Sequence, residues 1–94
     1  MSISRNNLKK NKPAIAVLGD GGWGTTLAIL LQRKGYPVTL WGVFPSYVAE
    51  LNKKRVNTKF LPGIKIPGAV KITADLKDAV KSKDLIILGL NSIL

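Results

Sequence analysis

Cysteine and histidine are both absent from the 94 residues of this chain. Without cysteine there can be no disulfide bond and no thiolate zinc site, and without histidine the commonest general acid or base and the commonest metal ligand are missing. Acidic residues are also scarce, because 5 Asp and Glu stand against 15 Lys and Arg and leave a net charge of +10. We therefore expect no metal site, and any chemistry must use other groups.

Long apolar runs are absent too. No stretch approaches the roughly 18 apolar residues that a membrane-crossing helix needs, and residues 1–13 lack the apolar segment of a secretion signal. We therefore expect a cytoplasmic location. The hydrophobic content of 46% predicts a chain that folds, and the length is that of one small domain.

The most informative feature that is present is a glycine-rich hexamer. Residues 14–18 form a short apolar run, residues 19–24 read Gly-Asp-Gly-Gly-Trp-Gly, and residues 25–31 suit a helix. The pattern G-x-G-x-x-G alone is weak evidence, but between a strand and a helix it is the fingerprint of a dinucleotide-binding site. The alternative is a plain glycine-rich turn.

Each glycine has a physical role in this interpretation. Gly19 permits a tight turn after the strand, Gly21 lets backbone amides approach a diphosphate, and Gly24 allows the helix to pack closely on the sheet. The unpaired amides and the dipole of the first helical turn favour an anion by roughly 0.3 to 2 kcal/mol. This orients a cofactor, so affinity must come from a longer groove.

Further strands and helices are expected to alternate along the rest of the chain. Their expected ranges are strands at residues 38–41, 70–73 and 85–90, and helices at residues 45–54 and 76–80. Residues 57–67 are expected to form an ordered loop, because they contain two prolines and a glycine. We predict an α/β fold of the Rossmann type, a doubly wound parallel sheet that is incomplete, with about four strands in the order 3-2-1-4.

The predicted domain organisation is simple. Residues 1–13 are expected to be a basic flexible arm, and residues 14–94 the N-terminal portion of a dinucleotide-binding domain, with the substrate domain absent. Because a full dinucleotide domain continues beyond its fourth strand, we expect a fragment whose fourth strand has an open hydrogen-bonding edge.

The chain resembles the bacterial-type NAD(P)-dependent glycerol-3-phosphate dehydrogenases. The resemblance rests on residues 19–28, Leu40-Trp41 and residues 57–64, in the order and spacing of the family, and it extends over residues 14–94. It implies NAD or NADP as cofactor and reversible hydride transfer between NAD(P)H and dihydroxyacetone phosphate, giving sn-glycerol 3-phosphate for phospholipid synthesis. It also implies a homodimer for the whole enzyme.

The family's catalytic lysine and substrate-binding residues lie outside this chain, so we assign no catalytic residue and expect the fragment to be inactive alone. The resemblance implies cofactor-binding positions at Gly19, Gly21, Gly22, Trp23, Gly24, Val43 and Phe60. Gly22 and Trp23 would contact the cofactor, and Phe60 would face it across the groove. For both aromatics the alternative is a packing role in the core, and for Phe60 this alternative is the stronger one.

Three positions depart from the family's pattern. Gly22 stands where serine is usual, which removes a hydroxyl for the pyrophosphate, and Asn91-Ser92 replaces Pro-Ser. Gly42-Val43 ends the second strand, where a carboxylate would bind a ribose 2′-hydroxyl and a basic residue a 2′-phosphate. Lys53-Lys54-Arg55 and Glu50 are weak substitutes, so the choice of cofactor stays open, with Val43 favouring NAD slightly.

Three other functions remain as alternatives. The chain could be a nucleotide-binding module without chemistry, or another Rossmann dehydrogenase with a different substrate, against which residues 57–63 argue. The net charge of +10 would also suit nucleic acid. However, the basic residues are dispersed and no aromatic residues alternate with them, so we expect no nucleic-acid partner.

Overall fold

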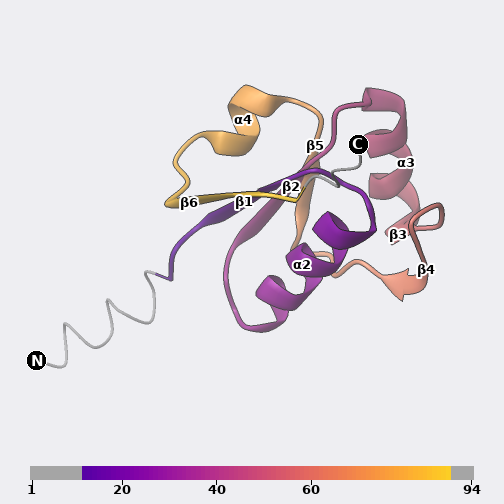
Figure 1. The fold of residues 1–94 in the computed structure, drawn as a ribbon, viewed down its shortest axis with the longest axis horizontal. Helices are drawn as coiled ribbons and strands as arrows, with labels where there is room; N and C mark the ends of the chain where they lie inside the picture. Colours follow the sequence, from indigo (N-terminus) through magenta and orange to yellow (C-terminus); the bar gives the residue numbers. More distant parts are fainter. Residues whose placement is uncertain (1–11, 90–94) are drawn as a thin grey trace, which may run out of the picture.

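The computed structural model describes residues 12–89, so residues 90–94 and residues 1–11 of the arm expected at residues 1–13 lie outside the described residues. A parallel sheet of four strands forms the centre, in the order β5-β2-β1-β6 (Figure 1). The strands of this sheet are β1 (Ile15–Leu18), β2 (Val38–Trp41), β5 (Lys71–Thr73) and β6 (Leu85–Leu88). The predicted order 3-2-1-4 is confirmed, with β5 as the third strand and β6 as the fourth.

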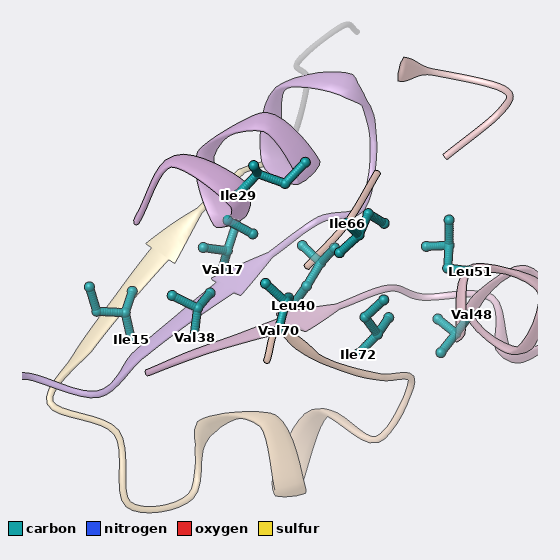
Figure 2. Close-up of a cluster of buried hydrophobic side chains, with 11 residues drawn as sticks. Ile15, Val17, Ile29, Val38, Leu40, Val48, Leu51, Ile66, Val70 and Ile72 are labelled. Carbon is teal, nitrogen blue, oxygen red and sulfur yellow. The ribbon is translucent and has the colours of Figure 1, made fainter. Parts of the chain in front are cut away.

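The fingerprint strand β1 occupies the interior of this sheet. Ile15 is in register with Val38 on one side and with Leu85 on the other. Three helices connect the strands, namely α2 (Gly22–Arg33), α3 (Pro45–Lys54) and α4 (Leu76–Val80). Helices α2 and α4 cover opposite faces of the sheet, which is the doubly wound arrangement (Figures 1 and 2).

The ends of the helices follow local sequence signals. Gly35 has a φ of 95°, so the glycine after the basic last turn of α2 ends that helix as expected. Pro45 occupies the first turn of α3, where its missing amide hydrogen has no cost. The carboxylate of Asp75 accepts a hydrogen bond from the amide of Asp78, so Asp75 caps α4 as predicted.

The expectation of an ordered loop without strands at residues 57–67 is wrong. This segment contains β4 (Leu61–Lys65), which pairs antiparallel with β3 (Val56–Asn57) in a separate two-stranded ribbon. The register is irregular, and Gly63 adopts a φ of 82°. An irregular ribbon tolerates proline and glycine, which therefore do not exclude strands here.

The core lies between the sheet and helices α2 and α3 (Figure 2). Its buried members are Ile15, Val17, Ala28, Ile29, Val38, Leu40, Val48, Leu51, Ile66, Val70 and Ile72. Each fully buried aliphatic side chain stabilises the fold by about 1.5 to 3 kcal/mol. Ile66 follows β4 and is 2% exposed, so it anchors the ribbon to the sheet.

Strand β6 is less covered than its apolar sequence suggests. Leu85, Ile86 and Leu88 are exposed, and among the described strands β6 pairs only with β1. Within residues 12–89, β6 is thus an edge strand. No helix in this part of the chain is long and apolar enough to cross a membrane.

Candidate functional site

The glycine loop begins where β1 ends. Gly19 has a φ of 127°, a conformation that side chains disfavour, and its amide donates to the carbonyl of Trp41 over 2.8 Å. The amide of Gly89 donates to the carbonyl of Leu18, also over 2.8 Å. The loop therefore rises at the carboxyl ends of three adjacent strands, β1, β2 and β6.

Gly24 allows a close approach between α2 and this loop. A Cβ atom at Gly24 would lie 1.9 Å from the carbonyl oxygen of Gly19 and 3.2 Å from that of Gly89. No side chain fits there without moving the backbone. The close packing that the sequence predicts for the third glycine is therefore present.

Gly21 has a different environment. It is the N-cap of α2, no side chain caps the helix, and a Cβ atom added at Gly21 would meet nothing within 4 Å. The first turn of a helix has no internal acceptors for its amides, and no described group accepts from the amides of residues 21–24. These four donors and the positive end of the helix dipole form an anion-binding position.

A cavity of about 510 Å³ opens beside this position. Its walls include Gly19, Asp20 and Gly21 from the loop, Val43 after β2, and Lys59 and Phe60 from the turn between β3 and β4. The start of α3 also contributes to it. The volume falls within the range of small-molecule sites, and the place, outside the carboxyl ends of the strands, is where doubly wound sheets bind ligands.

The predicted site residues divide into two groups. Gly19, Gly21, Val43 and Phe60 line the cavity, whereas Gly22, Trp23 and Gly24 form the first turn of α2 outside its lining. The packing alternatives for the aromatics are both wrong, because Trp23 is 56% exposed and Phe60 is 49% exposed. Phe60 thus presents an apolar surface to the cavity.

Gly22 packs against the turn that carries Phe60. A Cβ atom at Gly22 would lie 2.9 Å from the carbonyl oxygen of Phe60. A side chain here, such as the serine that the family resemblance implies, would require this turn to move. The small residue and the position of the turn therefore depend on each other.

Asn57 connects the parts of the site. Its side chain is fully buried, and its amide nitrogen donates to the carbonyl of Asp20 and to the hydroxyl of Thr25, each over 2.8 Å. Its amide oxygen accepts from the hydroxyl of Tyr47 and from the backbone amide of Phe60. One side chain thus joins the glycine loop, α2, α3 and the β3–β4 turn.

The sequence interpretation missed seven cavity-lining residues, of which two, Asp20 and Lys59, are charged. Asp20 is a variable position of the glycine pattern, yet this residue lines the cavity, and its Oδ2 is buried without a hydrogen-bond partner among the described residues. Burial raises the pKa of Asp20, and its own backbone amide partly offsets that effect. Lys59 brings a positive charge, with Nζ 5.2 Å from the centre of the Phe60 ring. The fold places both residues at the site, and no local pattern marks them.

The basic residues that end α3 do not line the cavity. Lys54 pairs with Glu50, and the guanidinium of Arg55 donates to the carbonyls of Pro67 and Val70 over 2.6 and 2.7 Å. Arg55 thus has a structural role at the loop after β4. Within residues 12–89, no cluster of acidic side chains could hold a metal ion.

Comparison with known proteins finds one family, over most of this chain. Residues 14–93 match the family model described as "NAD-dependent glycerol-3-phosphate dehydrogenase N-terminus". A glycerol-3-phosphate dehydrogenase [NAD(P)+] of Mannheimia succiniciproducens is 49% identical over 79% of this chain and 22% of its own length. That of Prosthecochloris aestuarii is 45% identical over 83% of this chain and 24% of its own.

The fold is also similar to solved structures. The crystal structure of glycerol-3-phosphate dehydrogenase from Coxiella burnetii superposes with a TM-score of 0.77 at 39% identity, covering 82% of this chain and 24% of that one. The structure of glycerol-3-phosphate dehydrogenase from Plasmodium falciparum superposes with a TM-score of 0.71 at 26% identity, covering 88% of this chain and 26% of that one. The chain thus spans about a quarter of the length of the relatives that it matches.

Proposed function

The chain belongs to the NAD-dependent glycerol-3-phosphate dehydrogenase N-terminus family, and we propose that it binds the diphosphate bridge of NAD or NADP at the N-terminus of α2. One observation carries this proposal. The amides of residues 21–24 have no acceptor among the described residues and lie beside a cavity at the carboxyl ends of the strands. Such an array of free donors is unfavourable unless water or an anion accepts from it.

The residues present fit a dinucleotide. Gly21 leaves open space above the amides, so the diphosphate can approach the backbone directly. Lys59 adds a positive charge, while Trp41, Val43 and Phe60 provide apolar walls for the nucleoside groups. When bound, NAD(P)H supplies the hydride for the reaction. The part of this chain is to hold the cofactor and fix its orientation.

The activity of the whole enzyme is part of the same proposal. We infer that this chain is the cofactor-binding portion of an enzyme that interconverts dihydroxyacetone phosphate and sn-glycerol 3-phosphate, a precursor of phospholipids. The names of its relatives support this reaction, and these relatives are about four times as long as the aligned part of this chain. We further infer from family resemblance that the enzyme is a cytoplasmic homodimer whose substrate-binding residues lie in the rest of that length.

Calorimetry with the 94-residue chain tests cofactor binding. We expect saturable heat on titration with NADH, and we expect ADP to compete because it retains a diphosphate, whereas adenosine competes much less. No heat with NADH at millimolar concentration would contradict the proposal. Equal competition by adenosine and ADP would show that the diphosphate is not held by the glycine loop.

A further inference from the structure

The carboxylate of Asp20 occupies a place that a residue after β2 would ordinarily fill. A Cβ atom at Gly42 would lie 2.0 Å from Asp20 Oδ2 and 2.6 Å from its Cγ. Gly42 directly follows β2, whereas Asp20 belongs to the glycine loop after β1. The absence of a side chain at position 42 therefore makes room for a carboxylate that comes from the neighbouring strand end.

This position has a defined chemical use in dinucleotide-binding folds. A carboxylate at the end of the second strand accepts hydrogen bonds from the ribose 2′-hydroxyl of NAD and disfavours the 2′-phosphate of NADP. Neither Gly42 nor Val43 has such a group. Asp20 lines the same cavity as Val43, and its carboxylate lies beside the Cβ position of Gly42, so a different residue brings a carboxylate to the end of β2.

No described side chain pairs with the carboxylate of Asp20. Within residues 12–89, Oδ2 is buried without a hydrogen-bond partner and neither ion pair includes Asp20. Leaving a partly buried carboxylate unpaired is unfavourable for folding. A residue that weakens the fold while lining a cavity is characteristic of a binding site.

We propose that Asp20 selects NAD over NADP by accepting a hydrogen bond from the ribose 2′-hydroxyl of the adenosine half and by repelling a 2′-phosphate. The inference rests on the proposed function and adds the choice of cofactor to it. Among the cavity-lining residues that the structure describes, Lys59 is the one with a basic side chain, and it is the group that would favour the opposite choice. Lys54 and Arg55 are engaged with Glu50 and with backbone carbonyls, so they do not offset the carboxylate.

The test compares dissociation constants of NADH and NADPH for the 94-residue chain and for Asp20→Asn. We expect the unchanged chain to bind NADH about tenfold more tightly than NADPH, the effect of one charge-assisted hydrogen bond. In Asp20→Asn this ratio should fall toward one, with NADH bound more weakly and NADPH more tightly. Asp78→Asn is the matched control, because it removes the same charge from the exposed pair with Lys71 and should leave the ratio unchanged.

A second experiment uses the unchanged chain and a modified ligand. The unchanged chain should bind 2′-deoxy-NADH about tenfold more weakly than NADH, because the ligand then lacks the hydroxyl that Asp20 accepts from. Equal affinity for NADH and 2′-deoxy-NADH, or tighter binding of NADPH than of NADH, overturns the role of Asp20. Failure of the chain to bind any of these dinucleotides instead contradicts the proposed function, and the inference fails with it.

Discussion

The side-chain amide of Asn57 donates a 2.8 Å hydrogen bond to the backbone carbonyl of Asp20, 37 residues earlier in the chain. The glycine loop is therefore held from outside, by a buried residue of the β3–β4 ribbon. Since the same side chain also contacts α2, α3 and the Phe60 turn, the walls of the cavity share one fixed point.

Replacing Asn57 should loosen the whole site. In Asn57→Ala, the hydrogen-bonding partners of a fully buried side chain lose their contacts, so we expect the free energy of unfolding to fall by about 2 to 4 kcal/mol. Urea denaturation measures this loss. Asn52→Ala is the matched control, because Asn52 donates to the carbonyl of Ile72 and accepts one exposed hydrogen bond from Arg55, and its loss should cost about 1 kcal/mol. Equal losses in the two variants would show that Asn57 has no special role.

Replacement by alanine should reduce stability at Gly24 and cofactor affinity at Gly21. At Gly24 the added Cβ meets the carbonyl oxygen of Gly19 at 1.9 Å, so we expect a loss of more than about 3 kcal/mol in stability. At Gly21 nothing lies within 4 Å, and φ is −74°, so Gly21→Ala should fold normally. Its methyl group should nevertheless weaken NADH binding severalfold by keeping the diphosphate from the amides. Thermal melting and calorimetry of both variants check this pair, and unchanged NADH affinity in Gly21→Ala argues against direct contact with the loop.

The buried carboxylate should make stability depend on pH. Burial raises the pKa of Asp20, so the folded chain holds this proton more tightly than the unfolded chain does. The contribution favours folding below the ordinary carboxyl pKa and is lost as pH rises through the raised value. Asp20→Asn should therefore be more stable than the unchanged chain near neutral pH, by about 1 kcal/mol or less because the residue is partly solvated.

Denaturation across a pH series measures this difference, which should shrink toward zero as the pH falls to the ordinary carboxyl pKa. Tyr47 also lines the cavity, and burial, followed by the charge of Asp20, raises its pKa above the ordinary phenol value, so Tyr47 stays neutral in this window. Lower stability of Asp20→Asn at neutral pH would mean that the carboxylate supports the fold.

The two exposed aromatics should differ in their effect on binding. Phe60 lines the cavity, so Phe60→Ala should weaken NADH binding about fivefold by removing apolar contact. Trp23 is expected to act through its backbone amide, which Trp23→Ala retains, so binding should change by about twofold or less. Fluorescence titration of NADH measures both. A larger effect of Trp23→Ala would show that the indole ring itself touches the cofactor.

Much of this fold is predictable from local sequence. The short, mainly apolar segments at residues 15–18, 38–41 and 85–88 form parallel strands, as expected. Right-handed crossovers predict the order of these strands in the sheet. The roles of the glycines could be predicted because each position in the pattern has a steric reason. At Gly24, for example, a Cβ atom would clash with the carbonyl oxygen of Gly19.

The remaining features depend on tertiary contacts. The β3–β4 ribbon is irregular and contains Pro62 and Gly63, so its strands leave no alternating pattern. Asn57 could be recognised only as part of a family motif, because three of its four partners, Asp20, Thr25 and Tyr47, come from other segments of the chain. The position of Asp20 beside Gly42 joins the ends of two strands, and only the folded sheet brings them together.

Amide chemical shifts of the ¹⁵N-labelled chain during titration with NADH test the central claim most directly. Hydrogen bonding to a diphosphate should shift the backbone amides of residues 21–24 more than those of any other segment, with ADP reproducing the shifts and adenosine failing to do so. Saturable NADH binding that leaves these four amides unshifted would contradict the account.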